Sequence, residues 1–353
     1  MSGIVFLDTV SPLAYDSRSF GERAVQGTEA SVMRIADGLG AWVMQHNRSR
    51  AWERYLPVQA IDAVEHVVVI REARALALAR HLFPNARLHL WLHDKLRPGS
   101  KRGRRLRRHA ALLRSAQVSI ICVSDTQRRE VLDTLHWAGI GGLPVCTRYN
   151  PLDEALQPDG SAVDERQLVF FSSPNKGLAF ALDAFATLRR AMPDLQLLVG
   201  NPGYKADAPA TLPGVKFLGP QPQAIMHREV RRSLCTFHPN FRIPETFGLV
   251  YAESHALGTP VLTHDFGAAA EIVGDPRQLL PVRPAYRCYE GMLGALGPRW
   301  RRLPARLAGG LGLFGAYLER VREWRDGARP VVGPDPRFAL RTVTAQWREL
   351  LGG

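Results

Sequence analysis

Short apolar runs alternate with helical stretches over the first part of the chain. Six runs have the length and composition of strands and cover residues 4–7, 42–45, 66–70, 87–92, 118–123 and 143–149. Helical periodicity lies between several of them, at residues 29–39, 73–82 and 126–135. Because the strand runs are continuously apolar rather than alternating, they indicate a parallel sheet covered by helices on both faces.

The same alternation restarts after a segment rich in breakers and polar residues at 150–162. The second series has strands at 168–171, 195–199, 215–218, 234–237 and 259–263, and helices at 178–191, 223–232 and 245–257. The pattern predicts an α/β protein with two Rossmann-like doubly wound domains, at residues 1–152 and 153–332. Residues 333–353 are expected to contain an amphipathic helix from 337 to 351, whose Phe338, Val343 and Trp347 pack on a neighbouring domain.

Composition is that of a globular protein with a strong basic excess. Its 353 residues suggest about two domains, and 46% hydrophobic residues supply sizeable cores. Formal net charge is +13, which attracts polyanions such as nucleic acid, anionic lipid or an acidic glycan. Much of that charge lies in one run from Lys95 to His109. This run fits either a solvated loop and helix or a surface for an anionic membrane or acidic acceptor.

The cysteines and the apolar segments bear on the compartment. Cys122, Cys146, Cys235 and Cys288 are scattered without the spacing of a zinc site or a disulfide framework. Their apolar surroundings fit reduced thiols. We find no secretion signal at the start and no apolar run long enough to span a membrane. The expected location is the cytoplasm, with peripheral contact at the inner membrane face if the basic run binds lipid.

The most informative segment runs from Pro244 to Val261. It contains two carboxylates eight positions apart, Glu245 and Glu253, with Gly248 between them and a Gly-Thr-Pro turn after them. If a helix begins near Phe247, the carboxylates lie roughly 12 Å apart by helix rise. A nucleotide sugar has hydroxyls at both ends and a diphosphate between them, so this layout suits such a ligand.

This segment resembles the Glu-x7-Glu motif of glycosyltransferase family four, whose retaining enzymes have the two-domain GT-B fold. The resemblance implies that Glu245 contacts the transferred sugar and that Glu253 binds the ribose of the donor. Phe247, Gly248 and Leu249 are implied to line the same donor site. The departure from the family pattern, Ser254-His255, leaves both carboxylates in place.

Other segments resemble the family in the same order along the chain. Ser172-Ser173-Pro-Asn-Lys176-Gly177 is similar to the loop in which a lysine meets the donor diphosphate, although Phe171 stands where many relatives have a nearby arginine. Lysine there would neutralise phosphate oxygens and the charge on the leaving group. Gly267 to Glu271 is similar to the family's glycine-rich loop near the phosphates and sugar. Arg242 is a further candidate phosphate contact.

In the first domain the resemblance is looser. Gln26-Gly27-Thr28-Glu29 is similar to the family's Gly-Gly-x-Glu loop beside the donor phosphate and the acceptor, with Gln26 replacing a glycine; Thr28 is alternatively an N-cap. His93 ends a predicted strand and resembles the histidine that reaches the sugar from the acceptor domain; its alternative is a buried structural role. Asn150-Pro151-Leu-Asp153 resembles the family's interdomain segment.

The resemblance implies an enzyme with an acceptor-binding first domain and a donor-binding second domain, and a C-terminal helix that returns to the first. It would transfer a sugar from a nucleotide-diphosphate sugar to a glycan or lipid-linked acceptor, in synthesis of cell-surface polysaccharide or glycoconjugates. Catalytic roles fall to Glu245, His93 and Lys176. No metal or cofactor is expected, and the sequence has no Asp-x-Asp motif.

Two other classes of protein stay open at this point. A nucleotide-sugar epimerase or hydrolase shares the architecture but needs no second acceptor. A nucleic-acid-binding protein would fit the basic run, which however lacks accompanying aromatic residues for base stacking. No nucleic-acid partner is therefore expected.

Overall fold

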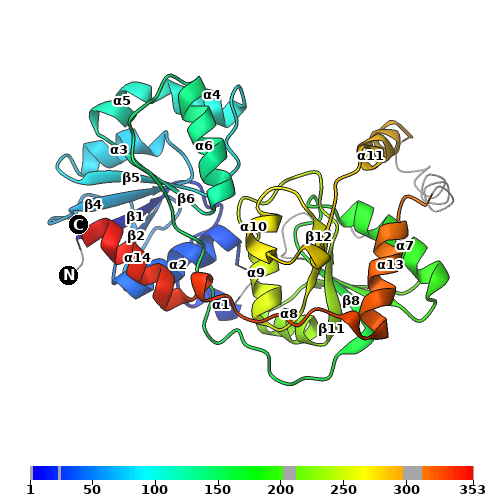
Figure 1. Ribbon diagram of the computed structural model, residues 1–353. Helices are drawn as coiled ribbons and strands as arrows, with labels where there is room; N and C mark the ends of the chain where they lie inside the picture. Colours follow the sequence, from blue (N-terminus) through cyan, green and yellow to red (C-terminus); the bar gives the residue numbers. More distant parts are fainter. Residues whose placement is uncertain (1–2, 23–24, 202–211, 297–311, 353) are drawn as a thin grey trace.

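The computed structural model describes residues 3–22, 25–201, 212–296 and 312–352, which form two domains side by side (Figure 1). The first sheet has seven strands in the order β3-β2-β1-β4-β5-β6-β7. Every strand pair in it is parallel. The strands are Ile4–Asp8 (β1), Trp42–Gln45 (β2), Tyr55–Pro57 (β3), His66–Ile70 (β4), Arg87–Leu92 (β5), Ser119–Cys122 (β6) and Val145–Thr147 (β7).

The second sheet repeats this plan. Its six strands have the order β10-β9-β8-β11-β12-β13, again with parallel pairing. They are Asp164–Phe171 (β8), Gln196–Asn201 (β9), Val215–Pro220 (β10), Ser233–His238 (β11), Val261–His264 (β12) and Leu279–Leu280 (β13). The prediction of two doubly wound parallel sheets is confirmed.

Helices cover both faces of the sheets, and the apolar composition of the strands follows from that cover. The first domain contains Ser19–Glu22 (α1), Gly27–Leu39 (α2), Ala75–Leu82 (α3), Lys101–Arg108 (α4), Ala110–Ser115 (α5) and Asp125–Trp137 (α6). Those of the second are Leu178–Ala191 (α7), Gln223–Arg231 (α8), Leu249–Ala256 (α9), Ala269–Val273 (α10), Pro284–Leu296 (α11) and Gly315–Glu323 (α13). No described helix is long and apolar enough to cross a membrane.

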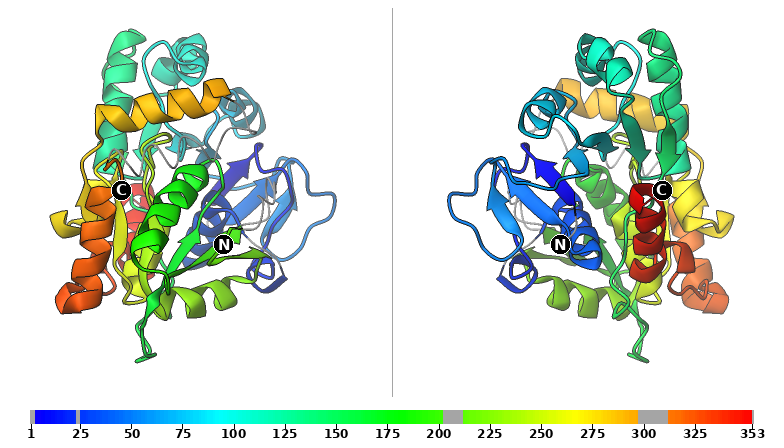
Figure 2. Two further views of the ribbon diagram at one scale, coloured as in Figure 1. Left: turned by 90° about the vertical axis from the view of Figure 1, so that its right-hand side faces the viewer. Right: turned by 90° about the vertical axis from the view of Figure 1, so that its left-hand side faces the viewer.

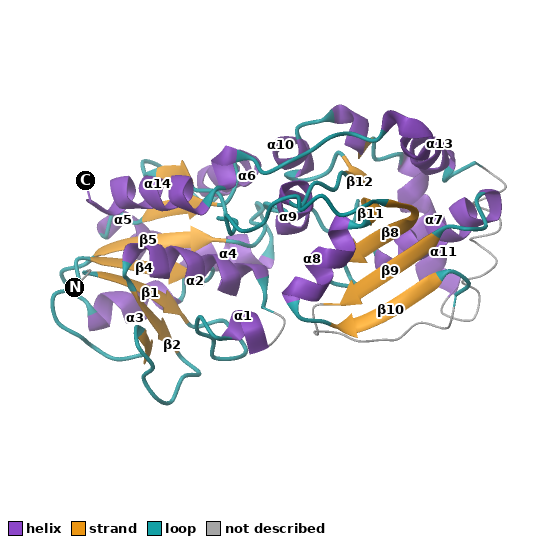
Figure 3. Ribbon diagram, turned by 90° about the horizontal axis from the view of Figure 1, so that it is seen from below, coloured by secondary structure: helices purple, strands orange, loops and turns teal. Residues whose placement is uncertain are grey.

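In each sheet the strand order reverses direction once, between β1 and β4 in the first and between β8 and β11 in the second. The loops that leave the carboxyl ends of such neighbouring strands diverge and open a crevice, where ligands bind in open α/β sheets. Figure 3 shows the arrowheads of β5 and of β9 and β10 pointing toward the region between the two domains. The two crevices therefore face each other.

The C-terminal helix Leu340–Gly352 (α14) crosses back to the first domain and packs on α2, as predicted (Figure 2, right panel). Val343 and Trp347 are fully buried, and the Trp347 ring lies 5.6 Å from that of Phe6 and 4.8 Å from that of Trp91. Phe338 is also buried and lies in the short helix Pro336–Phe338 before α14.

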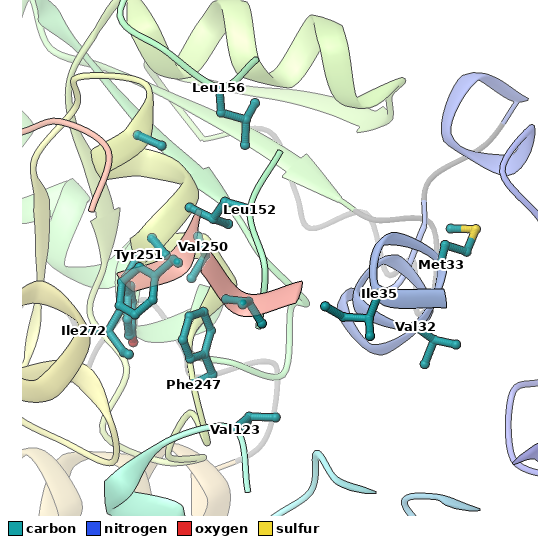
Figure 4. Packing of buried hydrophobic residues seen from close by; sticks show 14 of the residues in the cluster. Val32, Met33, Ile35, Val123, Leu152, Leu156, Phe247, Val250, Tyr251 and Ile272 are labelled. Carbon is teal, nitrogen blue, oxygen red and sulfur yellow. The ribbon is translucent and has the colours of Figure 1, made fainter. Parts of the chain in front are cut away.

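One hydrophobic cluster extends through both domains. It contains Val32 and Ile35 of α2, Leu152 of the connecting segment, and Phe247 and Tyr251 at the start of α9. Figure 4 shows the second-domain residues gathered beside Leu152, with the α2 residues across from them. Leu152 also donates its amide to the Phe338 carbonyl at 2.7 Å. The connection and the C-terminal segment thus join the two domains through an apolar seam.

Several predicted elements differ from the observed ones. The helix expected at residues 245–257 begins only at Leu249, because Gly248 has a φ of 94° that no helix interior allows. The C-terminal helix begins at Leu340 rather than at 337, since Pro336 opens a short 3-10 turn. α4 and α5 were not predicted as separate elements.

Candidate active site

A cavity of about 410 Å³ lies between the two domains at the facing crevices. Its second-domain wall comes from the loops after β8 and β11 and from α8 and α9; its first-domain wall comes from the start of α2 and the ends of β4 and β5. Ten predicted site residues line it: Gly27, His93, Ser172, Ser173, Lys176, Glu245, Phe247, Gly248, Leu249 and Glu253.

An ion pair between Lys176 and Glu245 lies in the second-domain wall. The Lys176 Nζ is 2.8 Å from Glu245 Oε2, and the Glu245 side chain is 8% exposed. The two residues meet because they follow β8 and β11, which are neighbours at the strand-order reversal. Gly177 permits the close approach: its φ is 101°, and a Cβ there would lie 2.9 Å from the Pro239 carbonyl oxygen.

The main chain of Glu245 is held by the loop after β12. Its carbonyl accepts the Ala268 amide at 3.0 Å, and Glu245 forms a parallel bridge with Gly267. Gly267 has a φ of 69°, and a Cβ there would lie 2.6 Å from the Glu245 carbonyl oxygen. Gly267 therefore supports the backbone of Glu245 and does not line the cavity, in contrast to the predicted donor contact.

Glu253 lies on α9 and lines the same wall. Burial raises the pKa of Glu253 to about 7, against the opposing charge of Arg34 from the first domain. Gln223 Nε2 of α8 donates to Glu253 Oε1 at 3.5 Å, the limit of hydrogen-bond length. Since α9 starts after Gly248, the loop with Glu245 and the helix with Glu253 are separate structural units that share one wall.

His93 extends from the end of β5 into the first-domain wall. Burial, reinforced by the Arg71 guanidinium, lowers the pKa of His93 to about 3, so its imidazole is neutral at physiological pH. The ring packs on Trp91 with centroids 4.4 Å apart. A neutral imidazole offers one donor and one acceptor nitrogen, which is suited to a sugar hydroxyl.

Beside His93 lies an ion pair that we did not predict. The Arg71 guanidinium donates to both carboxylate oxygens of Asp94 at 2.9 and 3.1 Å, and Arg102 of α4 lies 3.2 Å from the same carboxylate. Arg71 follows β4 with a φ of 65°, a left-handed conformation that is uncommon for a residue with a side chain. Nothing in the local sequence signals this conformation.

Four buried polar atoms of the cavity wall have no hydrogen-bond partner in the part of the chain that the structure describes. They are His93 Nε2, Asn150 Oδ1, His227 Nε2 and Glu245 Oε1. Unsatisfied buried polar atoms are uncommon and costly in folded proteins. Their convergence on one cavity indicates a polar ligand with several hydroxyl or amide groups.

Arg242 is exposed and absent from the cavity wall, so it is not at the predicted phosphate position in this structure. Its backbone amide donates instead to Asn240 Oδ1 at 3.3 Å. The N-cap of α2 is Gln26 rather than Thr28, and the Glu29 carboxylate accepts the Gln26 amide at 3.3 Å. Thr28 nonetheless lines the cavity.

The cavity also has wall residues that the sequence analysis did not select. Asn150 belongs to the connecting segment, which resembles the family's interdomain segment. That resemblance is the sequence signal that could have identified Asn150 as a site residue. His227 lies inside α8, where burial lowers its pKa to about 4, and its helical setting gives no signal of a site. Arg71 and Thr246 are likewise recognisable only once the strand ends are placed together.

The fold is that of GT-B glycosyltransferases. The sucrose-phosphate synthase of Thermosynechococcus elongatus superposes with a TM-score of 0.59 at 15% identity, over 98% of this chain and 97% of that one. The α,α-trehalose 6-phosphate synthase of Burkholderia multivorans gives 0.58 at 13% identity, over 99% and 98%. At such low identity these likenesses concern the fold alone.

One segment of the second domain matches a family of known sequences. Residues 157–280 match the model of the family described as Glycosyl transferases group 1, and this segment contains Lys176, Glu245 and Glu253. The predicted resemblance is thereby confirmed, and the chain carries a group 1 glycosyltransferase segment.

Curated relatives are similar over a comparable stretch. The phosphatidyl-myo-inositol mannosyltransferase of Mycobacterium tuberculosis is 28% identical over 176 residues, which is 47% of this chain and 46% of the relative. The protein of the same name from Mycolicibacterium smegmatis is 29% identical over 185 residues, or 50% and 46%. The chain thus spans about half the length of the curated relatives it matches.

Proposed function

We propose that this protein is a glycosyltransferase that moves a sugar from a nucleotide-diphosphate sugar to the hydroxyl of a glycan or lipid-linked acceptor. The observation that carries the proposal is the Lys176–Glu245 ion pair, which lies in the wall of an interdomain cavity beside several unpartnered polar atoms. A charged diphosphate and a polyhydroxylated sugar would satisfy both features.

Each end of the donor is assigned to one carboxylate. Glu253 accepts hydrogen bonds from the ribose hydroxyls, and Glu245 accepts them from the transferred sugar. Lys176 exchanges its partner Glu245 for the diphosphate oxygens when the donor binds. Ser172 and Ser173 add hydrogen bonds from the same loop, which begins at the carboxyl end of β8.

The proposed transfer retains the anomeric configuration. The bond between the anomeric carbon and the diphosphate oxygen breaks, the acceptor oxygen attacks from the same face, and the leaving phosphate oxygen takes the acceptor proton. Lys176 stabilises the charge that develops on the diphosphate, which is the effect with the largest expected contribution in such a site. No metal is assigned a role, so activity is expected to persist in excess chelator.

The relatives guide the choice of substrates to test first. Two of them are named phosphatidyl-myo-inositol mannosyltransferase, which supports a hexose donor and a lipid acceptor as the first candidates. The unpartnered polar atoms around Glu245 and His93 agree with a hexose, which has several hydroxyls.

The experiment is a panel of nucleotide sugars tested for binding by calorimetry and for slow donor hydrolysis. We expect one donor to bind the wild type and to fail with both Glu245→Ala and Lys176→Ala. Lys216→Ala, an exposed lysine on β10 of the same domain, is the matched control and should bind like the wild type. No binding by any donor would contradict the proposal, and free sugar or an epimer as the sole product even with acceptors present would favour a hydrolase or epimerase.

We further propose that α4 contacts an anionic membrane. Its side chains Arg104, Arg107 and Arg108 are exposed, while Arg102 of the same helix lies 3.2 Å from Asp94 in the cavity wall. Each basic residue near an anionic surface contributes about 1 kcal/mol. This arrangement supports peripheral binding that presents a lipid-linked acceptor close to the cavity.

Flotation with phosphatidylglycerol-containing and neutral vesicles tests the membrane contact. Replacing Arg104, Arg107 and Arg108 by serine should reduce binding to the anionic vesicles by about tenfold or more. The charge-matched control replaces Arg166, Arg228 and Arg277, whose side chains are 61%, 62% and 65% exposed in the second domain. Equal loss in both triple variants, or no loss in the first, would overturn this contact.

A further inference from the structure

Glu271, at the start of α10 in the second domain, contacts the first domain through both carboxylate oxygens. Oε1 accepts the Asp125 amide at 2.8 Å, and Oε2 accepts the Thr126 amide at 2.8 Å and the Thr126 hydroxyl at 2.7 Å. These donors form the first turn of α6. The sequence resemblance had placed this glutamate near the donor phosphates and sugar, but it is absent from the cavity wall.

The first turn of α6 needs an acceptor from elsewhere. The first amides of a helix have no partner within the helix, and the positive end of the helix dipole favours an anion. Within the first domain, the Ser124 hydroxyl accepts the Gln127 amide at 2.9 Å, and the Ser124 carbonyl accepts the Arg128 amide. The carboxylate from the other domain supplies the partners for the Asp125 and Thr126 amides.

We propose that Glu271 is an interdomain positioning residue, which holds the domains closed and thereby keeps Glu245 and His93 on opposite walls of one cavity. The catalytic part of this inference rests on the proposed function. The conformational part does not, because it concerns only contacts between the two domains.

Glu271 is coupled to Glu245 through a short stretch of chain. The Ala268 amide donates to the Glu245 carbonyl at 3.0 Å, and Gly267 bridges Glu245 directly. α10 begins at Ala269, only two residues before Glu271. Movement of Glu271 away from α6 therefore displaces the loop that supports Glu245.

A second set of contacts joins the same two walls. Ser124 Oγ donates to the Thr246 carbonyl at 2.6 Å, and Thr246 Oγ1 donates to the His93 carbonyl at 2.6 Å. Thr246 is the residue after Glu245, so its hydroxyl links the chain beside Glu245 to the backbone of His93. The Glu271 contacts lie at the same N-terminal end of α6, on the two residues after Ser124, and therefore help to hold Ser124 in place for this connection.

We call the contacts of Glu271 with Asp125 and Thr126 the clasp. Hydrogen–deuterium exchange of the ligand-free full chain tests the clasp at single-residue resolution. In the wild type we expect the Asp125 and Thr126 amides to be protected. Glu271→Ala should accelerate their exchange by about tenfold or more, while the Gln127 amide, held by Ser124 within the first domain, changes less than about twofold. Glu323→Gln, which removes a charge paired with Arg320 on the same helix, is the control and should leave all three amides unchanged.

Turnover of the donor found in the panel tests the positioning role. Glu271→Ala should lower kcat by about tenfold with a change below about threefold in donor Kd, because the Lys176 and Glu253 contacts lie within one domain. Glu271→Gln keeps one acceptor oxygen and should recover part of the loss. Unprotected Asp125 and Thr126 amides in the wild type, or identical exchange in Glu271→Ala, would overturn the clasp. A protected wild type that binds no donor would instead refute the proposed function and leave the clasp standing.

Discussion

The two walls of the cavity are built in different ways. The second-domain wall draws seven residues from the segment Glu245 to Glu253, and further residues from the β8–α7 loop with Lys176 and from the α8 region with His227. The first-domain wall is assembled from separate short pieces: the residues around Gly27 at the start of α2, Arg71 after β4, and His93 with Asp94 after β5. Each wall contains one ion pair: in the second the Glu245 side chain is 8% exposed and its partner Lys176 is 32% exposed, while Arg71 and Asp94 of the first are 22% and 23% exposed.

This difference indicates that one wall binds the donor and the other binds the acceptor. A compact segment with fixed carboxylates suits the donor, whose nucleotide and diphosphate have a constant chemistry. A wall made of separate short pieces can accommodate different acceptors more readily, because a substitution in one piece leaves the others unchanged. Variants at Lys176 and Glu253 in the second wall should therefore affect donor binding, whereas variants at Glu245, next to the reacting sugar, and in the first wall should affect mainly turnover.

The largest effect is expected from Glu245→Gln, which removes the charge next to the reacting sugar. We predict a loss of kcat of about 100-fold or more, the scale seen when one stabilising group is removed from an active site. Donor turnover in saturating acceptor measures it. Glu323→Gln on α13 serves as the control with unchanged turnover. Activity within about threefold of wild type would show that Glu245 does not contact the reacting sugar.

Lys176→Met should chiefly weaken donor binding. Hydrogen bonds to charged groups contribute about 1.5–3 kcal/mol, so donor affinity should fall by about 10- to 100-fold. Calorimetric titration with the nucleoside diphosphate isolates this effect from the sugar. Lys216→Met is the matched control, and an equal loss of affinity in both variants would argue against a specific diphosphate contact.

His93→Ala tests the role of the first-domain wall. Because His93 Nε2 lies unpartnered in the first domain, its loss should lower kcat by about tenfold while donor affinity stays within about threefold. The neutral imidazole also predicts that no step near pH 6–7 in the activity profile comes from His93. His136→Ala, an exposed residue on α6, is the control. A large loss of donor affinity would assign His93 to the donor side.

Glu253 gives donor binding a pH dependence. Its pKa of about 7 in the free protein means that the carboxyl is increasingly protonated below pH 7. Ribose hydroxyls are best accepted by the ionised form, so affinity should rise by about tenfold between pH 6 and pH 8 and then level off. Titrations across this range measure the effect, and Glu253→Gln should bind weakly with a flat profile. A wild-type affinity that falls with rising pH would contradict the assignment.

The smallest effect on activity is expected at the contact between Gly27 of α2 and Leu249 of α9. A Cβ on Gly27 would lie 2.7 Å from Leu249 Cδ1, so Gly27→Ala should push the start of α2 away from α9. Because the obstacle is the end of a flexible side chain, we expect a loss in kcat/KM of only about threefold to fivefold. Leu249→Ala in the same chain should restore most of it. No recovery in the double variant would mean that Gly27 acts through the ligand instead.

The sequence predicted the second wall better than the first. Lys176, Glu245 and Glu253 could be selected because their motif is contiguous or follows a clear apolar strand. The start of α9 was misplaced because the apolar period continues through Phe247, whereas Gly248 has a φ of 94° and precedes the helix. A Cβ at Gly248 would also lie 2.5 Å from the Tyr251 ring, and the apolar period reveals neither feature.

Tertiary placement also explains what was missed. Arg71 follows an ordinary buried strand, and only the neighbouring end of β5 with Asp94 gives its side chain a role. Glu271 seemed to belong to a phosphate-binding loop, yet its partners are amides 145 and 146 positions away in the chain. Contacts between residues this far apart become predictable only after the two domains are placed together.

The most direct measurement is a crystal structure of the protein with the donor identified in the panel, or with its nucleoside diphosphate. We predict diphosphate oxygens within hydrogen-bond distance of Lys176 Nζ, the ribose at Glu253, and the transferred sugar between Glu245 and His93. A ligand bound outside this cavity, or one whose ribose lies at Glu245, would contradict it.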